Sequence, residues 1–333
     1  MVNSFLISTG GSGGHVVPAT ILYEHLSKDA NVILSTDKRG LKFLNKDTFK
    51  IEIINTPKLN NFFLLPLNIF KIIILTINSF FLLKDKKINK IFSTGGYMSM
   101  PIIFAAKLLK LKIYLVEPNQ VLGRANKFFL NSCEKIFCYS EKIKNFPDDL
   151  KHKIVIINPL VGKNIYKLNS ISAVKKNKFT ILVVGGSQGA NIFDQNLKNS
   201  IIDISKRNPI KIIQQTNIKN VSELSEFYNK YNIENKIFSF DNNFANIIHK
   251  SDLCITRAGA STLAELSLMN IPFIAVPLPT SKDNHQFENA NFYKNKDCCW
   301  IIDQNDFEEK IEEHLNNIIN NKNEYLKIKE NLK

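Results

Sequence analysis

The stretch Arg257-Ala-Gly-Ala-Ser-Thr-Leu-Ala-Glu265 decides the fold class, because small residues around a glycine lead directly into a good helix sequence. The preceding Asp252-Leu-Cys-Ile-Thr256 is typical of a short buried strand, so the local order is strand, tight loop and helix. Free N–H groups of the first helical turn then point out of the strand's carboxyl end, and the helix dipole adds positive potential. The stretch predicts an anion site, most often for a phosphate; a plain capped helix with a surface Glu265 is the alternative.

Two similar glycine loops occur elsewhere in the chain. Gly10-Gly-Ser-Gly-Gly14 follows the apparent strand Phe5-Leu-Ile7, and Gly185-Gly-Ser-Gln-Gly189 follows Thr180-Ile-Leu-Val-Val184. One such loop would also fit an NAD-binding domain with Asp37 as the acidic ribose ligand. The repetition about 175 residues apart favours two Rossmann-like domains instead.

Strands alternate with helices along the whole chain, which predicts parallel sheets covered on both faces, with ligands at the carboxyl ends of the strands. The polar, lysine-rich stretch 158–178 is typical of an interdomain linker, so the predicted domains are 1–160 and 161–333. The tail from Asp306 predicts one or two charged amphipathic helices. Besides the strands named above, we predict strands at 31–35, 51–55, 112–117, 136–140, 154–157, 211–215, 236–240 and 272–276, and one that begins at Lys90.

The composition bounds the class of protein. A length of 333 residues suffices for two domains with full cores, and 44% hydrophobic against 22% charged residues is ordinary for a globular protein. The net charge of +14 favours anionic partners, which include nucleic acid, anionic lipid and phosphorylated substrates. Richness in Lys, Asn, Ile and Phe resembles the bias of an AT-rich genome, so we expect part of this charge to carry no function.

The five cysteines show no CxxC or Cys/His ligand spacing, which predicts buried thiols in a reducing compartment. The N-terminus begins with an apparent strand, so no signal peptide is expected.

The apolar stretch 62–83 is long enough to suggest a transmembrane helix, but Lys71 and two asparagines interrupt it and several lysines follow. We predict helices partly buried in the first domain, with a leftover apolar face that is ringed by lysines and rests on an anionic membrane. Core helices without an exposed face and a true membrane span are the alternatives.

Six motifs occur in the order and approximate spacing of one protein family. The chain resembles glycosyltransferase family 28, and within it the enzymes that transfer N-acetylglucosamine (GlcNAc) from UDP-GlcNAc to lipid I, which is undecaprenyl-diphosphoryl-MurNAc-pentapeptide. The resemblance implies a GT-B fold, with two Rossmann-like parallel-sheet domains facing each other across a cleft. It also implies inverting transfer to the 4-hydroxyl of MurNAc, which gives lipid II for peptidoglycan synthesis. The motifs are Gly10-Gly-Ser-Gly-Gly-His-Val-Val-Pro18, Gly95-Gly-Tyr-Met-Ser-Met-Pro101, Glu117-Pro-Asn-Gln-Val-Leu-Gly-Arg-Ala-Asn126, Gly185-Gly-Ser-Gln-Gly-Ala190, 257–265 and Asp283-Asn-His-Gln286.

The resemblance assigns roles to residues of the first domain. His15 is the candidate base that deprotonates the acceptor hydroxyl, a task that suits a neutral histidine near pH 7. Tyr97 and Ser99 would line the acceptor side. The donor diphosphate and sugar would be approached by Ser12, Gly13, Gly14 and Asn119, and Asn126 would help to shape the cleft.

In the second domain the resemblance implies most of the donor contacts. Glu265 would hold the ribose, the backbone at Asp241 would contact the uracil, and Gln286 would bind the GlcNAc hydroxyls. Helix N-termini can stabilise the departing UDP, so we expect no metal site and no tightly bound cofactor, with a divalent cation at most assisting. The diphosphate would be held by Ser187, Ala260, Ser261, Thr262, Leu263 and Ala264.

The implied partners are UDP-GlcNAc, lipid I and an anionic membrane surface, without nucleic acid, and the implied place is peripheral, on the cytoplasmic face of the bacterial inner membrane. Three positions depart from the family: Pro118 replaces a usual Gln, Val161 replaces an expected Arg, and Met100 replaces a glycine and is expected to narrow the acceptor loop. A related lipid glycosyltransferase with another acceptor, or a sugar-nucleotide-binding subunit without catalysis, are the alternative functions.

Overall fold

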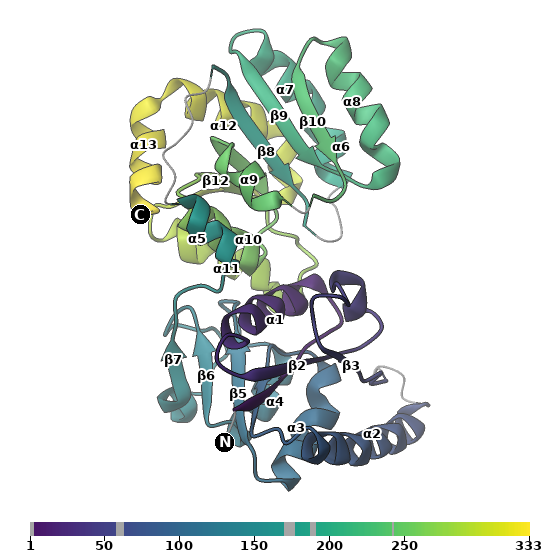
Figure 1. The fold of residues 1–333 in the computed structure, drawn as a ribbon. Helices are drawn as coiled ribbons and strands as arrows, with labels where there is room; N and C mark the ends of the chain where they lie inside the picture. The colour runs from purple at the N-terminus through teal and green to yellow at the C-terminus, as the bar shows by residue number, and fades with distance from the viewer. Residues whose placement is uncertain (1–2, 58–62, 170–176, 187–190, 242) are drawn as a thin grey trace. The chain divides into compact units, whose positions relative to one another are not determined.

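The computed structural model describes residues 3–57, 63–169, 177–186, 191–241 and 243–333. The chain divides into two compact units, Met1–Gly162 and Lys163–Lys333, each built on its own parallel sheet (Figure 1). The boundary falls two residues after the predicted position 160.

Unit 1 holds a seven-stranded parallel sheet in the order β3-β2-β1-β4-β5-β6-β7. Strands β1 to β3 are added toward one edge of the sheet and β4 to β7 toward the other, so the carboxyl ends of β1 and β4 form the topological switch point. The strands are β1 (Ser4–Ser8), β2 (Asn31–Thr36), β3 (Ile51–Ile53), β4 (Lys90–Ser93), β5 (Lys112–Glu117), β6 (Lys135–Cys138) and β7 (Ile154–Ile156), and the helices are α1 (Gly13–Leu26), α2 (Leu65–Asp85), α3 (Met100–Leu108) and α4 (Arg124–Phe129).

The two faces of this sheet carry separate apolar cores. Helix α1 covers one face, where Ala19 packs with Ile7 and Phe92. Helices α2, α3 and α4 cover the other face, where the larger core includes Leu83 and Phe129. Because successive strand residues point to opposite faces, a strand covered on both faces is buried throughout, as β1 shows with Phe5-Leu6-Ile7 at its centre.

Unit 2 repeats this plan with six parallel strands in the order β10-β9-β8-β11-β12-β13, so its switch point lies between β8 and β11. The strands are β8 (Phe179–Val184), β9 (Ile210–Gln215), β10 (Glu234–Phe238), β11 (Leu253–Thr256), β12 (Phe273–Ala275) and β13 (Trp300–Ile301), and the helices are α5 (Lys163–Asn169), α6 (Asn191–Asn196), α7 (Lys198–Ser205), α8 (Val221–Lys230), α9 (Phe244–His249), α10 (Ala260–Leu268), α11 (His285–Lys294), α12 (Phe307–Asn320) and α13 (Lys322–Asn331).

These elements confirm the predicted fold class of two Rossmann-like parallel-sheet domains and the pair of C-terminal helices. The two-residue strand β13 was missed, because so short a segment has no readable periodicity. The predicted linker was partly wrong, because α5 lies inside it and packs against α9 of unit 2. All five cysteines are free and buried, as predicted.

Helix α2 (Leu65–Asp85) covers most of the stretch 62–83, where several helices were expected. Helix α2 is 21 residues long and apolar enough to cross a membrane by length and composition, yet one face of it packs into unit 1. Asn68, Ile72, Ser79 and Leu83 make up this buried face. The opposite side is exposed and apolar, with Phe70 at 59% and Phe81 at 63% exposure, so the predicted leftover apolar face exists.

Candidate active site

Glycine loops lie at the switch point of unit 1 and before α10 in unit 2, whereas most of the predicted loop 185–189 lies outside the described residues. In unit 1 the loop after β1 leads into α1, and the loop after β4 leads through the short 3-10 turn Tyr97–Ser99 into α3. Gly11 and Gly95 have φ angles of 82° and 93°, which a residue with a side chain rarely adopts. Within the described chain, Ser12 precedes α1 without a side-chain capping bond, so the first N–H groups of α1 can serve a ligand.

His15 lies in the first turn of α1 and is held by the other glycine loop. Its Nδ1 atom is 2.8 Å from the carbonyl oxygen of Thr94. A carbonyl oxygen only accepts, so Nδ1 carries the proton, and a neutral His15 keeps its lone pair on Nε2. The Thr94 hydroxyl donates in turn to the carbonyl oxygen of His15 at 2.9 Å. The two loops therefore fix the imidazole in the tautomer that a general base needs.

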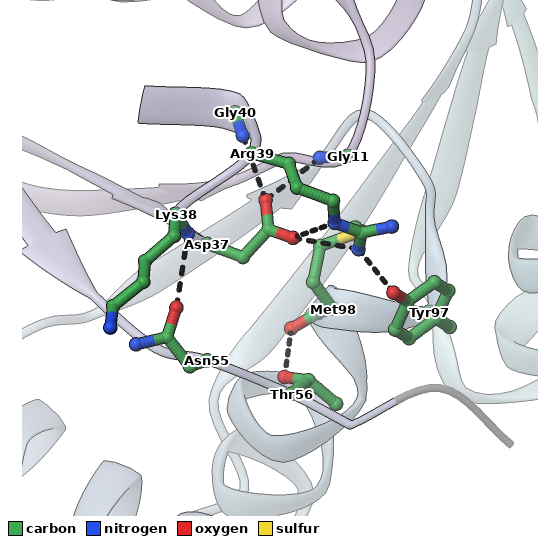
Figure 2. Close-up of polar contacts among 9 residues, drawn as sticks. All are labelled: Gly11, Asp37, Lys38, Arg39, Gly40, Asn55, Thr56, Tyr97 and Met98. Carbon is green, nitrogen blue, oxygen red and sulfur yellow. Dashed lines mark hydrogen bonds and ion pairs between the residues drawn. The ribbon is translucent and has the colours of Figure 1, made fainter. Parts of the chain in front are cut away.

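A second bridge joins the two loops through Asp37, the residue that an NAD site would have used, and Arg39, which no motif included (Figure 2). The buried carboxylate of Asp37 accepts from the backbone N–H groups of Gly11 and Gly40, both at 2.9 Å, and from Arg39 Nε at 2.7 Å. Arg39 also donates to the hydroxyl of Tyr97 and stacks over its ring, 5.2 Å from the centroid. We call this network the Asp37 bridge. Both carboxylate oxygens of Asp37 are hydrogen-bonded in it, so Asp37 is not placed to bind the ribose of an NAD cofactor.

Burial alone would raise the pKa of Asp37, but the hydrogen bonds from Gly40 and Gly11 and the Arg39 guanidinium outweigh it. The pKa of Asp37 therefore lies below its ordinary value, and the carboxylate stays ionised at neutral pH.

Two side chains near the glycine loop after β4, those of Ser99 and Met100, differ from the expectation. Ser99 is fully buried and its hydroxyl donates to the carbonyl oxygen of Gly95 at 3.2 Å, so it supports the turn and does not line an acceptor site. Met100 does not narrow this loop, because it packs on the core of unit 1 beside α2. Met98 fills that space instead: a Cβ on Gly96 would lie 2.5 Å from its sulfur.

A buried carboxylate organises the loop after β5. Glu117 is 3% exposed and accepts from Asn119 Nδ2 at 3.0 Å, from the N–H of Gly123 at 2.8 Å and from Asn126 Nδ2 at 3.0 Å. Asn126 is itself buried, at 2% exposure. Asn126 therefore shapes the loop after β5 from inside the domain, and its expected part in shaping the cleft stays a prediction. Asn119 is half-buried at the surface end of this network.

In unit 2, residues 252–265 adopt the predicted order of strand, loop and helix, as β11 and α10. Gly259 precedes α10 with φ of −72°, and among the described residues no side chain caps this helix. A Cβ on Gly259 would meet no described atom within 4 Å, so no described side chain or backbone atom crowds this position. Ala260, Ser261 and Thr262 are half-buried at the helix start, whereas Leu263 and Ala264 are buried, so these last two can offer a ligand only backbone groups.

Glu265 lies half-buried one and a half turns into α10. Burial raises the pKa of its carboxyl group to about 7. Within the described chain no hydrogen bond or ion pair compensates this carboxylate. A desolvated acceptor without a protein partner is suited to ligand hydroxyl groups, which donate without adding charge.

Arg257 has a structural role that the sequence did not reveal. Its guanidinium donates to the carbonyl oxygen of Val276 at 3.0 Å and to Gln304 Oε1 at 2.6 Å, and it stacks over Phe193. It therefore ties the loop before α10 to the end of β12.

The polar cluster at 283–286 contributes one oriented side chain. Gln286 Oε1 accepts from the N–H of Leu278 at 2.9 Å, which leaves the amide nitrogen to point away from that bond. Asp283 has a φ of 51°, and Asn284 rather than Asp283 is the N-cap residue of α11.

Ser187 and Asp241 were also predicted to contact UDP-GlcNAc. Ser187 lies outside the described residues. Asp241 forms an ion pair with Lys236 at 2.7 Å and accepts from the N–H of Asn243 at 2.8 Å. Lys236 and this N–H hold the pKa of Asp241 below its ordinary value. Of the described His, Cys, Asp and Glu side chains, no group of three or more could hold a metal ion.

Two parallel sheets of Rossmann order in one chain are the two domains of a GT-B fold, and two family models identify the class as a glycosyltransferase. The glycosyltransferase family 28 N-terminal domain matches residues 5–138, and the glycosyltransferase family 28 C-terminal domain matches residues 180–333. The chain belongs to glycosyltransferase family 28.

Similar proteins of known sequence support this membership. The chain is 48% identical over its full length to the UDP-N-acetylglucosamine--N-acetylmuramyl-(pentapeptide) pyrophosphoryl-undecaprenol N-acetylglucosamine transferase of Pelagibacter ubique, of which it covers 94%. It is 34% identical to the protein of the same name from Rickettsia felis, with 96% of the chain and 92% of that protein aligned.

Solved structures agree on the fold. MurG of Acinetobacter baumannii matches 100% of the chain and 94% of its own length at a TM-score of 0.77 and 22% identity. UDP-GlcNAc 2-epimerase from Neisseria meningitidis, bound to UDP-GlcNAc, matches 98% of the chain and 94% of its own length at a TM-score of 0.68 and 13% identity. At such identities these structures speak for the GT-B fold alone.

Proposed function

We propose that this chain transfers GlcNAc from UDP-GlcNAc to the 4-hydroxyl of MurNAc in lipid I, with inversion, and so produces lipid II for peptidoglycan synthesis. The family membership and the 48% identity to a transferase of that name support the substrates. The observation that carries the chemistry is the bond from His15 Nδ1 to the Thr94 carbonyl oxygen, because it leaves Nε2 as the proton acceptor.

In the proposed step the acceptor oxygen attacks the anomeric carbon of GlcNAc as the bond to the UDP oxygen breaks. The acceptor proton passes to Nε2 of His15, and the bonding electrons leave with UDP. Negative charge then grows on the departing diphosphate, where uncapped N–H groups at a helix start stabilise it. No described atom crowds the position of Gly259 before α10, which suits this role.

The remaining donor contacts would be made by side chains that can form further hydrogen bonds with a ligand. The ionised Glu265 would accept from the ribose hydroxyls, and the amide nitrogen of Gln286 would donate to a GlcNAc hydroxyl. The backbone at Asp241 would contact the uracil, and Ser187 would meet a phosphate. The proposal includes no tightly bound cofactor and leaves a divalent cation an assisting role at the diphosphate.

The decisive experiment is transfer of radiolabelled GlcNAc from UDP-GlcNAc to a lipid I analogue by the purified protein. Glu265→Ala is run beside the wild type, with UDP-GlcNAc affinity measured for both. We expect transfer by the wild type and loss of donor affinity in Glu265→Ala. Tight UDP-GlcNAc binding without transfer to any lipid I analogue would reject this acceptor in favour of another lipid or of a subunit without catalysis.

We further propose that the enzyme is peripheral on the cytoplasmic face of the bacterial inner membrane and docks through α2. The exposed side of α2 is apolar over several turns, whereas its buried side is part of the core of unit 1. A helix anchored in this way can lie on a membrane, but crossing it would require α2 to leave the domain. Exposed lysines at the ends of α2 suit anionic head groups.

Vesicle co-sedimentation tests the docking surface. Replacement of Phe70 and Phe81 by Ser should weaken binding to phosphatidylglycerol vesicles at least roughly tenfold, because both side chains are mostly exposed. Donor affinity serves as the folding control and should not change. Unaltered vesicle binding by this double variant would remove α2 from the membrane interface.

A further inference from the structure

A groove of about 440 Å³ runs between α2 and α3 of unit 1. Its walls come from side chains spaced four residues apart on each helix: Ile69, Ile73 and Ile77 on α2, and Met100, Phe104 and Leu108 on α3. This spacing places each set on one helical row, so two apolar ridges face each other across a trough about 12 Å long. Thr76 contributes a hydroxyl to the lining, and this hydroxyl donates to the carbonyl oxygen of Ile72.

The size and chemistry of the groove fit a hydrocarbon chain. An apolar cavity of about 150 Å³ binds one benzene molecule, so a groove about three times as large has room for roughly 18 carbon atoms. Among the described lining residues only Thr76 has a polar side-chain group, and its proton already goes to the Ile72 carbonyl oxygen, so the groove offers a polar ligand group at most one hydroxyl acceptor. A branched or linear hydrocarbon of three to four isoprene units is therefore the class of ligand it accepts.

Lysines on and next to α2 and α3 suit a surface that meets the anionic head groups of lipids. Between residues 65 and 87 and between 100 and 110, the chain contains a single acidic residue, Asp85. It has six lysines in the same segments, all exposed, and these favour phosphate groups near the two helices. The lysines are Lys71, Lys84, Lys86, Lys87, Lys107 and Lys110.

The groove also begins beside the second glycine loop. Met100 at its start is three residues after Tyr97, which places their Cα atoms at most about 11 Å apart. Tyr97 is bound to the Asp37 bridge, in the same unit as His15. A lipid whose sugar reaches His15 has to raise the first isoprene units out of the bilayer, and exposure of these units to water would cost about 0.8 kcal/mol per methylene. A groove that leads away from this loop would cover them.

We propose that the α2–α3 groove binds the isoprene units of the acceptor nearest its diphosphate, so that the enzyme distinguishes acceptors by their hydrocarbon chain as well as by their sugar. The inference rests on the proposed transfer to a polyprenyl-linked acceptor.

The test compares two soluble acceptor analogues, one with a five-carbon chain and one with a chain of four isoprene units, in wild type and in Thr76→Phe. The new ring fills the floor of the groove. We expect the wild type to prefer the longer chain at least tenfold in kcat/KM, and Thr76→Phe to reduce this preference to near unity while its rate with the five-carbon acceptor stays the same. Ile74→Phe is the matched control, because Ile74 is exposed on the same helix but outside the groove.

Three outcomes are informative. A long-chain preference that survives in Thr76→Phe overturns the inference, and Leu108→Trp repeats the test at a largely exposed wall position if Thr76→Phe fails to fold. Loss of binding to acceptor-free phosphatidylglycerol vesicles by Thr76→Phe, with the chain preference intact, would assign the groove to bilayer acyl chains. Absence of transfer to both analogues by the wild type would instead reject the proposed function, and the inference with it.

Discussion

The Nδ1 atom of His15, in the first turn of α1, lies 2.8 Å from the carbonyl oxygen of Thr94 at the end of β4. The contact joins the two glycine loops of unit 1, and a Cβ on Gly95 would lie 3.3 Å from the imidazole ring. The position of the candidate base therefore depends on a backbone atom 79 residues away.

Replacement of His15 by Asn distinguishes the role of His15 as a base from its structural contact with Thr94. The Asn amide nitrogen can still donate to Thr94, but it cannot accept the acceptor proton. We expect His15→Asn and His15→Ala both to lower kcat by roughly 10²–10⁴. Thermal stability should fall only in His15→Ala, and UDP-GlcNAc affinity should persist in both. A decrease of less than tenfold in His15→Asn would mean that His15 only shapes the loop.

Asp37→Ala should destabilise unit 1 by about 2–4 kcal/mol, because it leaves two backbone N–H groups and the Arg39 guanidinium without their acceptor. The native pKa of Asp37 lies below its ordinary value of 3.8, so its charge stabilises the fold above that pH. The stability that the charge supplies is lost as the pH falls through the native pKa. Urea unfolding from pH 7 to pH 3 gives the free energy of unfolding of the wild type and of Asp37→Asn. If the difference between these two free energies does not shrink on acidification, the stabilising role of the charge is contradicted.

Glu265 should make donor binding dependent on pH. Its pKa of about 7 means that roughly a tenth of the sites are ionised at pH 6 and nine tenths at pH 8. If the carboxylate accepts from the ribose, UDP-GlcNAc should bind up to about tenfold more tightly at pH 8 than at pH 6. Isothermal titration should show no such change in Glu265→Gln, and an equal pH dependence in both proteins would exclude Glu265 as its source.

The same pKa shift predicts a change in stability of the opposite sign. The folded-state pKa is raised from 4.5 to about 7, so between these values the folded chain keeps a proton that the unfolded chain has released. Without ligand, stability should therefore fall as the pH rises from about 4.5 to 7, by on the order of 1–3 kcal/mol relative to Glu265→Gln. Chemical denaturation at pH 5 and pH 8 checks this, and a constant difference between the two proteins would refute it.

Gly259→Ala tests whether a ligand approaches the backbone before α10. With φ of −72° and no described atom near the added Cβ, the substitution should leave stability unchanged or raise it by up to about 1 kcal/mol. UDP-GlcNAc affinity should nevertheless fall by roughly tenfold, about 1.4 kcal/mol, if the diphosphate approaches this backbone. Gly11→Ala is the contrast: its φ of 82° should reduce stability by about 1–2 kcal/mol. Unchanged affinity in Gly259→Ala would place the diphosphate elsewhere.

The sequence by itself determined the two parallel-sheet domains, the glycine loops and the start of α10, because these depend on local order. Apolar runs of strand length, glycines that permit positive φ and helix-forming residues after them are readable within ten residues of one another. The boundaries of β5 and β11 follow this local pattern closely. The family motifs added roles for His15 and Glu265.

Only the tertiary structure decided which of the motif residues face a ligand. Ser99 and Asn126 stand in the motifs beside candidate ligand residues, yet both are buried, because folding places the Gly95 carbonyl and Glu117 against them. The Asp37 bridge joins Arg39 to Tyr97 across 58 positions of sequence. The α2–α3 groove likewise exists only where two helices pack. Such contacts depend on long-range geometry, and hydrogen bonds and close packing act over a few ångströms in space whatever the separation along the chain.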